Sequence, residues 1–171
     1  MNNKALILVD FEKQWIDEKS DYFVGDVSDL IQRTNKLIDY CRQSGYKIIF
    51  TRHVEEDSEE EFAPNSENVE IIDGVNKQES DAIITKNKIS PFYKTKLEQE
   101  LEGVGEMVIC GILTNLCVRS LAQDAYDRDF DITIVKDCCK AFDKETHEFT
   151  IKDLKKTREE IRFLNVDEFL N

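Results

Sequence analysis

Residues 107–129 read MVICGILTNLCVRSLAQDAYDRD, an apolar strand followed by a short turn and a helix with Cys117 in its first turn. Unpaired N–H groups at the start of a helix carry roughly half a positive charge, which favours a thiolate over a thiol. We therefore predict that Cys117 is a reactive nucleophile. The strand-turn-helix order also predicts one unit of a parallel α/β sheet.

The same alternation of strand and helix recurs along the chain. Apolar, strand-like segments occupy 4–10, 46–51, 81–85, 106–113, 131–137 and 161–165. Helical spacing between them predicts helices that begin at an N-cap on Ser28 or Asp29, at a capping box of Thr95 with Glu98, after the strand at 106–113, and at about 143. This order predicts a three-layer α/β/α fold with a mainly parallel, six-stranded, Rossmann-like sheet. No repeat or linker divides the chain, so we expect residues 1–171 to form a single domain.

The charge of the chain excludes several partners. Its 36 acidic and 23 basic residues give a net charge of −13, which disfavours binding to nucleic acid or to anionic membranes. No signal sequence is visible at the N-terminus, and no window approaches the roughly 20 apolar residues of a membrane-spanning helix. The segment EEDSEEE at 55–61 predicts a solvated loop. We expect a small-molecule substrate as the partner.

The cysteines and histidines indicate neither a disulfide framework nor a metal site. Cysteines stand at 41, 110, 117, 138 and 139, an odd number with no C-x-x-C motif. This pattern is typical of reduced thiols in the cytoplasm. The two histidines, His53 and His147, lie far apart in the sequence, so we expect no metal and no cofactor.

Three reactive residues are predicted to meet at one edge of the sheet. Asp10 ends the first strand, Lys86 follows the third, and Cys117 follows the fourth. Ligands of open α/β sheets bind outside the carboxyl ends of the strands. A thiolate, an ammonium that favours it and a carboxylate that moves protons together suit acyl transfer. Backbone N–H groups in the turn at 112–117 would then face the oxyanion.

Three segments resemble the isochorismatase-like superfamily of cysteine hydrolases, which includes the nicotinamidases. They are LILVDFEKQW at 6–15, KNKISPF at 86–92 with TKLEQEL after it, and GILTNLCVRSLAQDAYDRDFDITIVKD at 111–137. The resemblance implies that Asp10 is a general acid and base, that Lys86 is its charge partner, and that Cys117 is the nucleophile.

The resemblance also implies details of the site and assembly. It suggests a cis peptide bond between Ile112 and Leu113, with the amides of Leu113 and Cys117 forming an oxyanion hole. Trp15 and Phe92 match aromatic residues of the substrate pocket in relatives. Relatives commonly form dimers or larger assemblies, so we expect a homo-oligomer.

The chain departs from the pattern of this superfamily at four places. Glu12 stands where Gln is frequent, Lys88 where Arg is frequent, and Asn115 where Asp is frequent. Nicotinamidases with a metal site use an Asp and several His after the second strand, whereas this chain has only His53 there. This difference argues against a bound metal and against nicotinamide as the substrate.

We therefore predict hydrolysis of a C–N, amide-type bond through a thioester, and two alternatives remain open. One is vinyl-ether hydrolysis of the isochorismatase type, which would release pyruvate instead of ammonia. The other is a redox-sensing thiol protein, with the adjacent Cys138 and Cys139 as a second feature.

A cysteine phosphatase is excluded because Gln123 occupies the place of its arginine, six residues after Cys117. No G-x-G-x-x-G motif or P-loop indicates a nucleotide-binding module.

Overall fold

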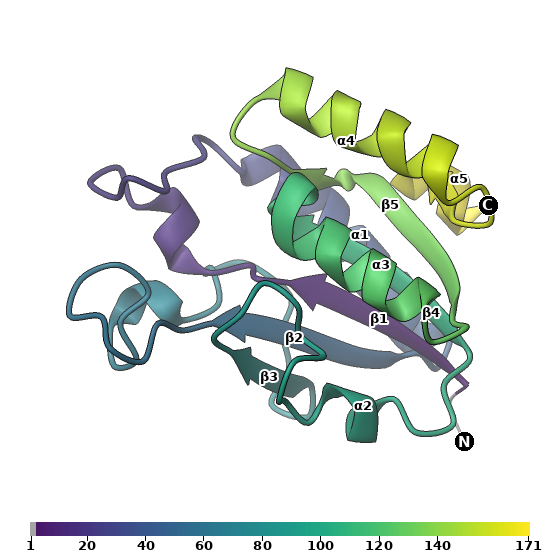
Figure 1. Ribbon diagram of the computed structural model, residues 1–171, viewed down its shortest axis with the longest axis horizontal. Coiled ribbons are helices and arrows are strands. Elements are labelled where there is room, and N and C mark those ends of the chain that lie inside the picture. Colours follow the sequence, from purple (N-terminus) through teal and green to yellow (C-terminus); the bar gives the residue numbers. More distant parts are fainter. Residues whose placement is uncertain (1–2) are drawn as a thin grey trace.

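The computed structural model describes residues 3–171 and contains one six-stranded sheet (Figure 1). The strands are β1 (Lys4–Val9), β2 (Lys47–His53), β3 (Ala82–Lys86), β4 (Glu106–Ile112), β5 (Asp131–Lys140) and β6 (Arg162–Leu164). They lie in the order β3-β2-β1-β4-β5-β6, and every neighbouring pair is parallel. The predicted six-stranded parallel sheet is confirmed.

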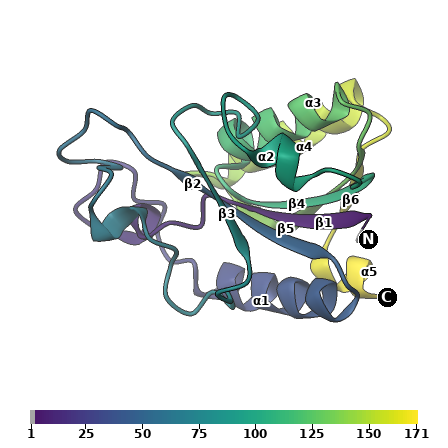
Figure 2. The same ribbon diagram turned by 90° about the horizontal axis from the view of Figure 1, so that it is seen from below.

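Helices cover both faces of the sheet, as Figure 2 shows. One face carries α1 (Ser28–Gln43) and α5 (Val166–Leu170), and the other carries α2 (Leu97–Glu100), α3 (Arg119–Tyr126) and α4 (Lys144–Thr157). Two short 3-10 helices, η1 (Lys13–Ile16) and η2 (Glu67–Val69), lie in the loops beyond β1 and β2. In α1 the side chains of Leu30, Leu37, Ile38 and Cys41 recur at helical spacing and are buried, so one face of the helix joins the core.

The centre of the sheet is the pair β1 and β4, which is in register from Lys4 and Glu106 to Val9 and Gly111. All residues from Ala5 to Val9 are fully buried. Gly111 has a φ of +140°, and a Cβ added there would lie only 2.7 Å from the Cβ of Val9. Only glycine fits this position, where the two strands approach each other just before the turn of Cys117.

The N-terminus of α1 differs from the prediction. Its N-cap is Val27 and not Ser28 or Asp29. The carboxylate of Asp26 instead accepts hydrogen bonds from both the N–H (2.9 Å) and the hydroxyl (2.6 Å) of Ser28. Asp26 lies two residues before the first residue of the helix. The prediction considered only residues next to the apolar pattern and therefore placed the cap too late.

The predicted capping box at Thr95 is also wrong. The N-cap of α2 is Lys96, one residue later than a box of Thr95 with Glu98 requires. The hydroxyl of Thr95 still accepts a hydrogen bond from the N–H of Leu97, at 3.1 Å. Glu98 consequently does not make the return hydrogen bond to the N–H of Thr95 that a capping box requires.

The two ends of the described chain lie at the same side of the molecule. The start of β1 and the C-terminal Asn171 are both found at the amino ends of the strands, opposite their carboxyl ends (Figure 1). Among residues 3–171, no helix combines the length and the apolar character needed to cross a membrane. The acidic segment 55–61 forms a mostly exposed loop after β2.

Candidate active site

Asp10 directly follows β1, and a neighbouring strand holds its carboxylate. Its φ of 51° lies in the left-handed region, which is uncommon for a residue other than glycine and occurs often at functional sites. The hydroxyl of Thr51, on β2, accepts a hydrogen bond from the Asp10 N–H at 3.1 Å and donates one to Oδ1 at 2.5 Å. Both residues are fully buried. Thr51 therefore fixes the carboxylate on one side and leaves Oδ2 for another partner.

That partner is Lys86, the last residue of the edge strand β3. Its buried side chain brings Nζ to 2.8 Å from Asp10 Oδ2 and 3.5 Å from Cys117 Sγ. The contact with Oδ2 is an ion pair whose angle departs from that of a regular hydrogen bond. Burial alone would lower the pKa of Lys86, but its contacts with Asp10 and Cys117 outweigh burial and raise the pKa. Lys86 is therefore an ammonium at neutral pH.

Cys117 lies in a π-helical turn, η3 (Thr114–Val118), which continues directly into α3. Its sulfur is nearly buried, with 8% of the residue exposed. Burial and the charge of Asp10 raise the pKa of the thiol, and Lys86 opposes them only in part. The prediction of a thiolate favoured by the helix terminus is thus wrong for the free protein. A general base must remove the proton before the sulfur can attack.

The turn before Cys117 has the backbone conformation that the resemblance implied. The peptide bond between Ile112 and Leu113 is cis. The carbonyl of Leu113 accepts hydrogen bonds from the N–H groups of Leu116 (3.2 Å) and Val118 (3.1 Å), which closes the turn around Cys117. The assignment of the Leu113 and Cys117 amides to an oxyanion hole stays a prediction.

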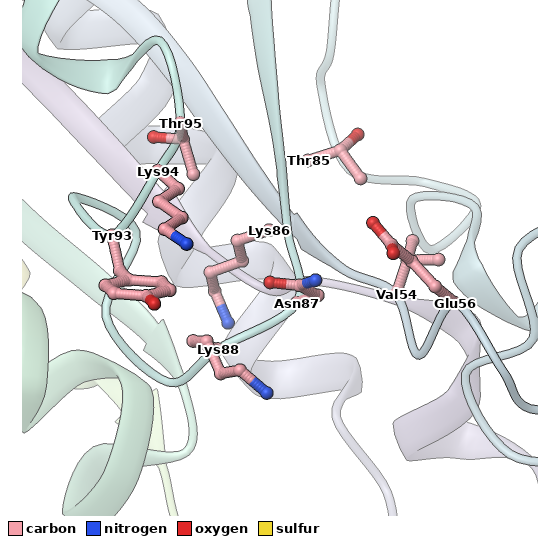
Figure 3. Close-up of a pocket in the computed structure, with 9 residues that line it drawn as sticks. All are labelled: Val54, Glu56, Thr85, Lys86, Asn87, Lys88, Tyr93, Lys94 and Thr95. Atoms are coloured by element: carbon pink, nitrogen blue, oxygen red, sulfur yellow. The ribbon is translucent and has the colours of Figure 1, made fainter.

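A cavity of about 380 Å³ lies beside these residues (Figure 3). Val54 and Glu56, from the segment after β2, are on one side, and residues of the loop after β3 are on the other. The lining residues are Val54, Glu56, Thr85, Lys86, Asn87, Lys88, Tyr93, Lys94 and Thr95. Lys86 belongs to both the cavity wall and the buried cluster, so the cavity adjoins the cluster on the β3 side.

The two predicted pocket aromatics do not line this cavity. Trp15 is buried and packs edge-on against Phe62, with 5.3 Å between ring centroids. Phe62 in turn packs edge-on against the ring of His53, at 5.1 Å. The ring centroid of Phe92 lies 4.2 Å from the guanidinium of Arg128, which follows α3. A pocket role for Trp15 and Phe92 remains a prediction.

Sequence reasoning missed two residues of β2 that contact the cluster. Thr51 binds Asp10, as described above, and His53 places Nδ1 3.3 Å from Lys86 Nζ. The other ring nitrogen of His53 lies 2.7 Å from Glu55 Oε1. Thr51 ends the strand predicted at 46–51, which was a usable signal, whereas His53 lies two residues beyond that predicted strand.

Glu12 is an unusual buried acid close to the cluster. It is fully buried, and neither carboxyl oxygen has a hydrogen-bond partner within residues 3–171. Burial and the charge of Asp10 raise its pKa well above the ordinary value. This raised pKa favours the neutral carboxylic acid, which is similar in shape and charge to the glutamine common in relatives.

The residues around His53 do not fit a metal ion of the kind that some nicotinamidases hold after the second strand. One ring nitrogen faces the ammonium of Lys86, and the other faces Glu55. A cation beside Lys86 would meet a positive charge. Within residues 3–171, no group of three or more His, Cys, Asp or Glu side chains could hold a metal ion.

Comparison with known proteins identifies the family to which the chain belongs. A sequence model described as the Isochorismatase domain matches residues 4–162. The uncharacterised isochorismatase family protein YddQ of Bacillus subtilis is 30% identical over 133 residues, which cover 72% of this chain and 74% of that protein. Nicotinamidase 3 of Arabidopsis thaliana is 27% identical over 165 residues, which cover 88% and 79% of the two chains.

A solved structure extends the likeness to three dimensions. The pyrazinamidase of Pyrococcus horikoshii, crystallised in complex with zinc, superimposes with a TM-score of 0.83 at 25% identity. The match covers 95% of this chain and 99% of that one. The chain therefore belongs to the isochorismatase family of hydrolases.

Proposed function

We propose that this protein is a cysteine hydrolase that cleaves a C–N, amide-type bond of a small molecule through a thioester. The observation that carries the proposal is the buried cluster in which Lys86 Nζ lies 2.8 Å from Asp10 and 3.5 Å from Cys117. Relatives named as a nicotinamidase and a pyrazinamidase support an amide as the substrate. The assigned roles are general acid and base for Asp10, charge partner for Lys86 and nucleophile for Cys117.

In the first step, Asp10 accepts the proton of the Cys117 thiol and the sulfur attacks the carbonyl carbon. The raised pKa of the thiol means that attack requires a general base. The ammonium of Lys86 stabilises the charge on sulfur as it develops. The amides of Leu113 and Cys117 would donate hydrogen bonds to the oxyanion, and one such donor is typically worth about 3 to 4 kcal/mol.

The second step breaks the C–N bond. Protonated Asp10 gives its proton to the leaving nitrogen, which departs as ammonia or an amine and leaves a thioester on Cys117. Asp10 then accepts a proton from water, the hydroxide attacks the thioester, and the proton returns to the departing sulfur. The products are a carboxylic acid, the free amine and the starting enzyme.

The decisive experiment compares the wild type with Cys117→Ala on a panel of small amides. Wild-type protein should release ammonia and carry an acyl group on Cys117 that is detectable by mass spectrometry, whereas Cys117→Ala should show neither. Cys41→Ala is the control, because this buried thiol lies on α1, away from the cluster. Undiminished ammonia release by Cys117→Ala would end the proposal. Pyruvate release from a vinyl ether by both proteins would establish the isochorismatase-type reaction in its place.

The proposal also covers the location, the domain organisation and the oligomeric state of the enzyme. We infer a cytoplasmic, single-domain protein that acts on a small molecule as a homo-oligomer, either a dimer or a larger assembly. Exposed apolar side chains such as Ile89, Leu116 and Phe142 support self-association. Sedimentation equilibrium should give at least twice the mass of the 19.9 kDa chain, and a monomer across the micromolar range would contradict this inference.

A further inference from the structure

We propose that His53, oriented by Glu55, is a positioning residue that fixes the ammonium of Lys86 between Asp10 and Cys117. The proposal rests on the function proposed for these three residues. It also assigns a role in the site to Glu55, the first residue of the acidic segment 55–61.

The first argument is the number of partners around Lys86. An ammonium has three N–H donors and no acceptor. Three electron-rich atoms surround Nζ: Asp10 Oδ2 at 2.8 Å, His53 Nδ1 at 3.3 Å and Cys117 Sγ at 3.5 Å. Nζ thus has three partners, an ion pair with Asp10 and hydrogen bonds to His53 and Cys117, and removal of His53 would leave it with two.

The second argument is the proton arrangement of the imidazole. Lys86 can only donate, so Nδ1 of His53 must accept and carry no proton. The neutral ring then holds its proton on Nε2, which donates to Glu55 Oε1 at 2.7 Å. Glu55 therefore selects the tautomer that Lys86 requires and also fixes the plane of the ring.

The third argument is that the backbone holds the pair in place. His53 is the partner of Lys86 in the register of β2 and β3, and the Val54 N–H donates to the Lys86 carbonyl at 2.9 Å. The Glu55 N–H donates to the carbonyl of Phe62 at 2.9 Å, and the Phe62 ring packs against His53. The backbone on both sides of His53 is therefore held, and rotation of the ring would break its contacts with Phe62, Glu55 and Lys86.

The consequence concerns the contact between Lys86 and sulfur. This contact is the longest of the three and the most sensitive to rotation of the ammonium. Without the acceptor at His53, the donor directions of Lys86 are set by Asp10 alone. Lys86 would then stabilise a developing thiolate less well, although substrate binding would not change.

The test uses four variants of the full chain and two measurements. His53→Ala removes the acceptor, His53→Asn restores one through Oδ1, and Glu55→Ala removes the orienting carboxylate from a half-exposed position. Glu59→Ala is the matched control, an exposed acid of the same loop. The measurements are kcat and KM for an amide from the panel, and the rate of Cys117 alkylation by iodoacetamide between pH 6 and 9, resolved by peptide mass.

His53→Ala should lower kcat by about tenfold to a hundredfold with KM changed less than about threefold, because positioning errors act on the reacting geometry. Alkylation of Cys117 should slow by about threefold to tenfold, which corresponds to a rise of about 0.5 to 1 in the pKa of its thiol. Glu55→Ala should show a smaller loss of the same kind. His53→Asn and Glu59→Ala should stay within about threefold of the wild type.

Alkylation of His53→Ala at the wild-type rate, or His53→Asn as slow as His53→Ala, would overturn the proposal. If His53→Ala does not fold, as judged by thermal unfolding, the comparison of Glu55→Ala with Glu59→Ala decides. The two measurements separate this proposal from the amidase function. If alkylation slows in the variants as expected but the wild type turns over no amide, only the proposed function is contradicted. If the wild type turns over an amide but alkylation is equally fast in all variants, only the positioning role is contradicted.

Discussion

At the scale of single residues, the carboxylate of Asp10 depends on Thr51 as much as on Lys86. The hydroxyl of Thr51 is both donor and acceptor to Asp10, and it lies on a different strand. Thr51→Val keeps the shape of the side chain but removes both hydrogen bonds. We expect a loss of about 1 to 3 kcal/mol in the free energy of unfolding, because the partners are buried and one is charged. We also expect kcat to fall by at least about tenfold.

Urea unfolding and steady-state kinetics of Thr51→Val and Thr51→Ser test this prediction. Thr51→Ser retains the hydroxyl and should recover most of kcat, although the lost methyl group costs some stability. Equal kcat values for the two variants would show that the hydroxyl does not orient Asp10.

Glu12 leads to a prediction about pH. An unfolded chain releases the proton of this carboxyl near the ordinary value of 4.5, whereas the folded protein holds it to a much higher pH. The folded state therefore binds more protons over this window, so stability falls as the pH rises, by up to about 1.4 kcal/mol per pH unit. Gln cannot ionise, so Glu12→Gln should escape this loss.

Urea unfolding of wild type and Glu12→Gln at pH 4, 6 and 8 measures the difference. The two proteins should differ least at pH 4, and the advantage of Glu12→Gln should grow toward pH 8. Activity at neutral pH should be retained, because glutamine has nearly the shape of glutamic acid and needs no proton. Parallel stability curves would mean that Glu12 is ionised in the folded protein.

At the scale of elements, Gly111 is the position where β1 and β4 admit no side chain. An alanine Cβ would meet the backbone and the Cβ of Val9 in a conformation that L-residues rarely adopt. Gly111→Ala should cost at least about 1 to 3 kcal/mol, the range for overpacking a core. It should also impair activity, because Asp10 and the turn before Cys117 both follow this contact.

Gly105→Ala is the matched control for Gly111→Ala, since its added Cβ would meet no atom within 4 Å. Thermal unfolding and kcat should be close to wild type in this control and reduced in Gly111→Ala. A Gly111→Ala protein as stable as the control would show that β1 and β4 can separate without cost.

The success of sequence analysis also differs between elements. Apolar runs located every strand, and the rule that parallel strands end together placed Asp10, Lys86 and Cys117 at one edge. Thr51 and His53 were missed because their partners become neighbours only once the register of β1, β2 and β3 is known. The state of the Cys117 thiol was misjudged because a helix terminus is a local feature, whereas burial and the charge of Asp10 come from the tertiary fold.

At the scale of the whole molecule, the net charge of −13 means that negative side chains repel one another within the folded protein. Salt shortens the range of this repulsion from about 30 Å at 0.01 M to about 8 Å at 0.15 M. We expect the free energy of unfolding to rise with salt over this range, by on the order of 1 kcal/mol. Urea titrations in NaCl and KCl test this prediction, and agreement between the two salts excludes specific binding of the cation. A fall with salt would mean that ion pairs such as Arg42 with Asp81 dominate.

The placement of the two chain ends has a practical consequence for anyone who handles this enzyme. Both ends of the described chain lie at the amino side of the sheet (Figure 1). Asp10, Lys86 and Cys117 instead stand at or just beyond the carboxyl ends of β1, β3 and β4, and Lys86 also lines the cavity. A fusion partner or a linker to a solid support, attached at either end, would leave the entrance to the site facing the solution. Immobilised protein should therefore keep its access to substrate, and the same attachment points suit a surface-based binding assay.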